Sequence, residues 1–130
     1  MDLESVKSDI EKVIISEDQL QDRLKEVAKQ IDADYQGKEL LLIGVLKGAV
    51  MVMADLTRYM NRHVEIDWMA VSSYGSGTKS SGVVRILKDL DRDITGKNVL
   101  IIEDIVDTGL TLDWLSNNLK SRGAGSVEIM

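Results

Sequence analysis

Short runs of branched apolar residues alternate with polar stretches along the chain, and this pattern predicts strands alternating with helices. The runs predict buried strands at Leu40–Leu46, Val64–Ser72, Val83–Leu87, Val99–Ile102 and from Ser126 to Met130. Helical spacing predicts one helix opening near Ser16, a second over Ala49–Tyr59, and a third over Leu112–Lys120 that ends at Gly123. Such an order is typical of βαβ units, and therefore of an α/β fold whose mostly parallel sheet is flanked by helices.

The first two helices have recognisable sequence signals. Ser16 and Gln19 match a capping box at a helix start. The residues that recur at helical spacing after it, and that we expect to form the packed face, are Leu20, Leu24, Val27 and Ile31. The second helix is apolar on most sides, so we expect Met51 and Met53 to fill the core.

Composition limits the classes of protein to consider. With 130 residues and 44% hydrophobic content, residues 1–130 are expected to form one domain with a single core. A net charge of −6 argues against nucleic-acid binding, which requires a basic surface. No apolar run approaches the roughly 18 residues of a membrane span and the N-terminus lacks the pattern of a signal peptide, so we expect a cytoplasmic protein without membrane contact. The chain has no cysteine, and the single His63 is expected at the surface, which leaves no histidine-based catalysis to propose.

Two adjacent acids follow the most apolar of the predicted strands. Glu103 and Asp104 come directly after Val99–Ile102, at a carboxyl end of the sheet, where α/β proteins bind their ligands. Because neighbouring residues on a strand point to opposite faces, we expect one carboxylate to meet ribose hydroxyls or hydrated Mg²⁺ directly and the other through water. The alternative is a pair of solvated charges at a strand end.

A short loop rich in hydroxyl groups comes next, running from Asp107 through Thr108, Gly109 and Leu110 to Thr111. Gly109 permits a tight turn into a helix that starts near Leu110, and the amides of that helix start, with the hydroxyls of Thr108 and Thr111, predict a phosphate pocket. In the alternative interpretation, Asp107 or Thr108 only caps the helix.

A second candidate anion site is the turn Lys47-Gly48 after the strand Leu40–Leu46, since it also falls at a carboxyl end of the sheet. A solvated lysine beside a glycine turn is the alternative. Between Ser72 and Gly82 the sequence SSYGSGTKSSG is too polar and glycine-rich for regular structure and predicts a mobile loop. A passive hairpin connection is the alternative there.

Several separated motifs, in order, carry a resemblance to a known family. The segment VLIIEDIVDTGLTL (Val99–Leu112) resembles the phosphoribosyl pyrophosphate (PRPP) binding motif of the type I phosphoribosyltransferases. Together with VLKGAV (Val45–Val50), the run Asp67–Asp91 and the opening IEKVIIS, it makes nearly the whole chain similar to bacterial hypoxanthine-guanine phosphoribosyltransferases.

The resemblance implies the type I phosphoribosyltransferase fold and a purine salvage reaction. The enzyme would move 5-phosphoribosyl from PRPP to hypoxanthine or guanine with Mg²⁺, giving IMP or GMP and pyrophosphate. It also implies a homo-oligomer, either a dimer or a tetramer. A regulator that binds nucleotide without catalysis is the alternative. A receiver-like phosphoacceptor domain is disfavoured because the first strand ends in Leu46-Lys47-Gly48 rather than in an acidic pair.

The resemblance also implies a role for each group of residues. Leu46, Lys47 and Gly48 would bind pyrophosphate, with a cis bond between Leu46 and Lys47. The loop from Asp107 to Thr111 would bind the 5′-phosphate, and Asp107 would handle the purine proton.

For the remaining groups, the resemblance implies that Glu103 and Asp104 hold the ribose and the metal. The flexible loop would be a lid that brings in Ser72, Ser73 and Tyr74. Family members continue well beyond the position of Met130, with a lysine and an aromatic residue that read the purine. We therefore expect a C-terminally incomplete domain that keeps the PRPP half of the site, and PRPP binding without turnover is one expected behaviour.

Overall fold

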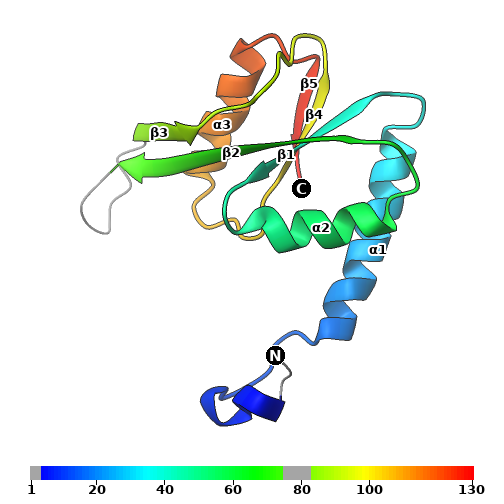
Figure 1. The fold of residues 1–130 in the computed structure, drawn as a ribbon, viewed down its shortest axis with the longest axis vertical. Helices are drawn as coiled ribbons and strands as arrows, with labels where there is room; N and C mark the ends of the chain where they lie inside the picture. The colour runs from blue at the N-terminus through cyan, green and yellow to red at the C-terminus, as the bar shows by residue number, and fades with distance from the viewer. Residues whose placement is uncertain (1–3, 75–82) are drawn as a thin grey trace.

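The computed structural model describes residues 4–74 and 83–130, which form a sheet with helices on both faces (Figure 1). In chain order its elements are η1 (Glu4–Asp9), α1 (Glu17–Asp34), β1 (Leu40–Val45), α2 (Ala49–Tyr59), β2 (Glu65–Tyr74), β3 (Val83–Lys88), β4 (Asn98–Ile102), α3 (Leu110–Ser121) and β5 (Ser126–Ile129). The strand order is β3-β2-β1-β4-β5. Only β3 pairs antiparallel, with β2, so the prediction of a mostly parallel α/β sheet is confirmed.

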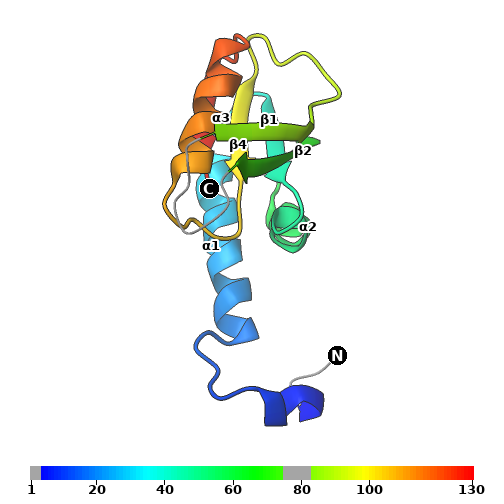
Figure 2. The same ribbon diagram turned by 90° about the vertical axis from the view of Figure 1, so that its left-hand side faces the viewer.

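Alternate residues of the central strand β1 face two separate cores. Leu41, Ile43 and Val45 pack with α3 on one face of the sheet. Leu40 and Leu42 pack with α1 and α2 on the other. The two views show α3 apart from α2, with the sheet between them (Figures 1 and 2). A strand covered on both faces needs apolar residues throughout, which explains why β1 reads as one continuous apolar run.

The capping box at the start of α1 is confirmed. The Gln19 backbone N–H donates to the Ser16 hydroxyl at 3.2 Å, and the Ser16 N–H donates to the Gln19 side-chain oxygen at 2.9 Å. Leu24 and Ile31 are buried as expected, but Leu20 is 48% exposed, so its predicted place in the packed face is wrong. The first turn of α1 extends past the sheet (Figure 1). No described helix is both long and apolar enough to cross a membrane.

The two methionines of α2 have different environments. Met53 is 2% exposed and contributes to the core as predicted, whereas Met51 is 71% exposed and does not. The reason is that α2 buries only one side, at Ala49, Met53 and Leu56, although its sequence is apolar on most sides.

Strand β2 continues further than its sequence predicted. Ser72, the last residue of the predicted strand, pairs with β3, and so do Ser73 and Tyr74, so the expectation of irregular structure is wrong for Ser73 and Tyr74. Main-chain hydrogen bonds to the neighbouring strand do not depend on side-chain polarity, so a polar composition does not exclude a strand. The rest of the predicted mobile loop, residues 75–82, lies outside the described residues.

The close approach of β1 and β2 leaves room for glycine alone at one position of β1. Gly44 pairs with Trp68 of β2, and a Cβ at Gly44 would lie 2.3 and 2.5 Å from carbons of the Trp68 ring and 3.2 Å from the end of Met53. The indole therefore occupies the space that any other residue at position 44 would fill.

We expect Gly44→Ala to lower the free energy of unfolding by about 1–3 kcal/mol, because a methyl group at this position overpacks the core. Urea denaturation measures the change. The control is the same substitution in a Trp68→Leu background, where the loss should be clearly smaller. An equal loss in both backgrounds would show that contact with the indole is not the cause.

Candidate functional site

The predicted site residues gather at one edge of the sheet. β1, β2 and β4 are parallel and adjacent, so their carboxyl ends lie side by side. The turn 46–48 follows β1, and Glu103 and Asp104 follow β4. β2 runs five residues past Met69, the partner of the last β1 residue, which takes Ser72–Tyr74 beyond the end of β1.

The turn after β1 and the acids after β4 are in direct contact. A Cβ added at Gly48 would lie 2.4 and 2.6 Å from the two carboxylate oxygens of Asp104. The peptide bond between Leu46 and Lys47 is cis, as the sequence resemblance implied. Lys47, the residue before Gly48, is exposed. Only glycine at position 48 leaves room for this carboxylate against the turn.

The acid pair is electrostatically strained. Burial, reinforced by the hydrogen-bonding and like-charge interaction with Asp104, raises the pKa of Glu103 to about 7. The Asp104 backbone N–H, which donates to the Glu103 carboxylate at 3.2 Å, offsets part of this increase. Glu103 is therefore only partly ionised at neutral pH, and a cation at the pair would favour its ionised form.

The loop after the acids leads into α3 as predicted. Gly109 has a φ of +80°, a left-handed conformation that favours glycine, and its carbonyl accepts from the Asp113 N–H at 2.9 Å. The Leu110 N–H donates to the Thr108 hydroxyl at a long 3.4 Å. Within the described residues the Asp107 carboxylate accepts no hydrogen bond, and it is exposed. Asp107 therefore does not cap α3. The start of α3 follows the acids at the same edge of the sheet.

The described residues contain no cluster of three or more histidine, cysteine, aspartate or glutamate side chains placed to hold a metal ion. Glu103 and Asp104 supply two carboxyl groups. This number suits a magnesium ion that keeps waters and takes its other ligands from a bound phosphate.

Asp67 is a buried carboxylate that sequence reasoning missed. It is 3% exposed and accepts from the Trp68 and Asp91 N–H groups at 2.8 and 3.0 Å. Lys88 and Arg92 lie 4.0 and 3.4 Å from its oxygens. The signal was present in the sequence as an acid enclosed between the apolar residues Ile66 and Trp68. It anchors the base of the β2–β3 hairpin and lies away from the carboxyl edge. His63 is exposed, as predicted.

Comparison with known proteins identifies the family. The family described as "Phosphoribosyl transferase domain" matches residues 16–130. A hypoxanthine-guanine phosphoribosyltransferase of Mycobacterium tuberculosis is 54% identical over 127 residues, covering 93% of this chain and 63% of its own length. One from Streptococcus agalactiae is 51% identical over 124 residues, covering 95% and 69%.

The solved structures agree. A hypoxanthine phosphoribosyltransferase from Staphylococcus aureus superimposes with a TM-score of 0.92 at 45% identity, over 97% of this chain and 68% of that one. The chain therefore belongs to the phosphoribosyltransferase family and has its fold. It spans a little under two thirds of the length of the mycobacterial relative.

The raised pKa of Glu103 predicts a pH dependence of stability. Because the folded state holds this proton up to about pH 7, its stabilising effect is complete below about pH 4.5, the ordinary value, and is lost as pH rises through 7. We expect Glu103→Gln to gain stability relative to the parent chain between pH 5 and pH 8. Urea unfolding at both pH values measures this. Glu39→Gln, at an exposed position, controls for the loss of one negative charge. A constant difference between Glu103→Gln and the parent would contradict the shift.

Proposed function

We propose that residues 1–130 act as one phosphoribosyltransferase domain that binds PRPP with Mg²⁺ and transfers its 5-phosphoribosyl group to hypoxanthine or guanine. The observation that carries this proposal is the contact between Asp104 and the Gly48 turn. A carboxylate pair, an exposed lysine and the loop into α3 follow the neighbouring strands β1 and β4 at their carboxyl ends, and these are the groups that a sugar pyrophosphate with a divalent cation requires. The shared name of the relatives favours a transferase over a nucleotide-binding regulator.

Each group has a proposed role in binding PRPP. The helix start and the hydroxyls from Thr108 to Thr111 hold the 5′-phosphate, since backbone amides at a helix N-terminus bind anions. The turn Leu46-Lys47-Gly48 holds the pyrophosphate. Glu103 and Asp104 hold the ribose hydroxyls and the metal, and Ser72–Tyr74 close over the phosphates from the end of β2.

Mg²⁺ is proposed because the two carboxylates are hard oxygen donors and the phosphates would complete its coordination. When bound, the ion neutralises negative charge on the departing pyrophosphate. It would also draw Glu103 into its ionised form, so that the raised pKa of this residue should fall on binding.

The residues of this chain contribute positioning, charge stabilisation and proton transfer. A purine ring nitrogen attacks the anomeric carbon, the bond from that carbon to the pyrophosphate oxygen breaks, and its electron pair leaves with pyrophosphate. Lys47 stabilises the leaving group. Asp107, exposed and without a hydrogen-bond partner among the described residues, takes the proton from the purine. The loop 108–111 fixes the ribose phosphate and so orients the reacting carbon.

The first test mixes the purified chain with Mg²⁺, PRPP and hypoxanthine or guanine, and follows both PRPP binding and nucleotide formation. We expect PRPP binding. If nucleotide forms, Asp107→Asn should lower its rate by about 10²-fold or more while PRPP binding stays close to that of the parent, because asparagine keeps the shape of the side chain in the phosphate loop but cannot take the proton.

PRPP binding without nucleotide formation would show that purine recognition limits the activity of this chain. Absence of both from a folded chain would refute the proposed function. Turnover unaffected by Asp107→Asn would remove Asp107 from its role and leave the rest intact.

A second test separates the site from the fold. Gly48 has φ −58° and ψ −44°, which any residue adopts, so Gly48→Ala should change the free energy of unfolding by less than about 1 kcal/mol. The added methyl group displaces the exposed Asp104 carboxylate, and we expect the affinity for magnesium pyrophosphate to fall about tenfold, as measured by calorimetry. Val50→Ala, at an exposed position beside the turn, should leave that affinity unchanged. Equal affinities for the Gly48 and Val50 variants would contradict the role of the contact.

A further inference from the structure

Arg85 is an arginine to which the described part of the chain offers no anionic partner. It is exposed, and among the described residues it forms no hydrogen bond or ion pair. The other arginines each contact a carboxylate or a carbonyl oxygen: Arg23, Arg58, Arg62, Arg92 and Arg122. The chain has 22 acidic side chains against 16 basic ones, so acidic partners are abundant. A guanidinium group left free in such a chain is available to bind an anion from outside.

The strand pairing fixes the face of the sheet on which Arg85 lies. Val71 of β2 pairs with Ile86 of β3, and both pack on the core beneath α3. The next pair along the two strands is Ser72 with Arg85. Because neighbours on a strand point to opposite faces and directly opposed residues share a face, Arg85 points to the face that α1 and α2 cover. The turn 46–48 leads into α2, on that same face.

Arg85 also lies beyond the end of β1, as the turn 46–48 does. The last residue of β1 pairs with Met69, and Ser72 is three residues further along β2, or about 10 Å at about 3.3 Å per residue. β3 lies two strands from β1, about 10 Å across the sheet at about 4.8 Å per strand (Figure 1). Of the described residues at these strand ends, Lys47 and Arg85 are the cations.

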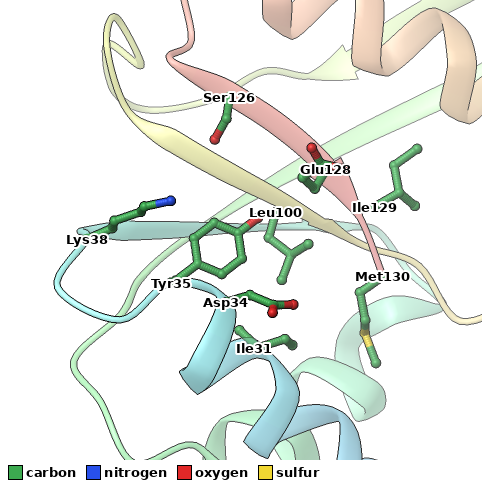
Figure 3. Close-up of a pocket in the computed structure, with 9 residues that line it drawn as sticks. All are labelled: Ile31, Asp34, Tyr35, Lys38, Leu100, Ser126, Glu128, Ile129 and Met130. Carbon is green, nitrogen blue, oxygen red and sulfur yellow. The ribbon is translucent and has the colours of Figure 1, made fainter.

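The largest described hollow of the molecule lies elsewhere and has the wrong charge for a polyphosphate. A cavity of about 490 Å³ lies between the end of α1 and the strands β4 and β5 (Figure 3). Two acids, Asp34 and Glu128, line it against one lysine, Lys38. This negative balance disfavours a polyphosphate there. The free arginine at the carboxyl edge is the better place to look for an anion contact.

We propose that Arg85 binds the pyrophosphate group of the ligand together with the turn Leu46-Lys47-Gly48, and that it selects a pyrophosphate over a single phosphate. The inference rests on the proposed function, which puts the pyrophosphate on this turn. Lys47 supplies one positive charge there, whereas a pyrophosphate carries several negative ones. The planar guanidinium group of Arg85 can hold two oxygens of the second phosphoryl group at once. A single phosphate on the turn lacks that group and does not extend toward β3.

The position of β3 gives another possible reason for a charge at Arg85. In the described sheet β3 is an edge strand, and charged side chains on an edge discourage pairing with other chains. That role needs no ligand, so it predicts that removing the charge leaves phosphate binding unchanged. A binding experiment therefore separates the two explanations.

The test is calorimetric titration of the full 130-residue chain with magnesium pyrophosphate and, separately, with inorganic phosphate in the presence of Mg²⁺. We expect Arg85→Gln to lower the affinity for magnesium pyrophosphate by about tenfold or more and that for inorganic phosphate by less than about twofold. Arg85→Lys should give an affinity for pyrophosphate between these two proteins, because lysine keeps the charge but loses the planar fork.

Two further variants serve as controls. Lys29→Gln removes one positive charge from an exposed position on α1 and should leave both affinities unchanged. Lys47→Gln removes the cation of the turn and should weaken pyrophosphate binding. Because Arg85 is exposed, we expect its variants to unfold at the same urea concentration as the parent chain.

The outcomes separate this inference from the proposed function. A parent-like affinity for pyrophosphate in Arg85→Gln, with Lys47→Gln weakened, would overturn the inference and leave the proposed function intact. Equal losses for pyrophosphate and inorganic phosphate would also overturn it, because they would show a general effect of charge. A folded parent chain that binds neither magnesium pyrophosphate nor PRPP would refute the proposed function and this inference with it.

Discussion

The parallel pairing of β1 with β4 is the constraint on which the rest of the site depends. It brings two strand ends from distant parts of the sequence to one edge, where the Asp104 carboxylate lies against Gly48. Neither segment would hold this arrangement alone. The register is fixed by burial on both faces, since a slip of one residue would exchange the side chains that pack on α3 with those that pack on α1 and α2. The geometry of the polar edge is therefore set by the apolar core beneath it.

Much of the fold was predictable because its signals are local. The continuous apolar runs of β1 and β4, the capping box at Ser16 and the glycine at the start of α3 each report a nearby physical requirement, and the structure confirms them. The errors arose where the environment is not local. Leu20 and Met51 look like core residues, but whether anything covers them depends on elements distant in sequence. Ser73 and Tyr74 were predicted to lie in a loop because composition does not reveal that β3 supplies their hydrogen-bond partners.

The candidate site was predictable in its members and not in its contacts. Acids, lysine and hydroxyls at strand ends indicate where a ligand binds, because the carboxyl edge is the usual place. Sequence could not reveal that Asp104 touches the turn at Gly48, or that burial raises the pKa of Glu103. It also passed over Asp67, whose partners Asp91 and Arg92 become neighbours only after β2 and the segment following β3 pack together. The roles assigned to these residues stay predictions, whereas membership of the phosphoribosyltransferase family is shown.

Under the proposed function, the electrostatics of this edge favour binding of the anion and the cation together. The chain has a net charge of −6, and two of its carboxyl groups are adjacent at the candidate site, so a polyphosphate alone would meet repulsion there. A divalent cation alone would find only two carboxyl ligands, one of which is partly protonated at neutral pH. In that proposal the cation would favour the ionised form of Glu103 and screen the acids, and the phosphates would complete the coordination of the cation. Under the proposed function, affinity for PRPP should therefore depend steeply on Mg²⁺, a coupling that follows from the acid pair itself.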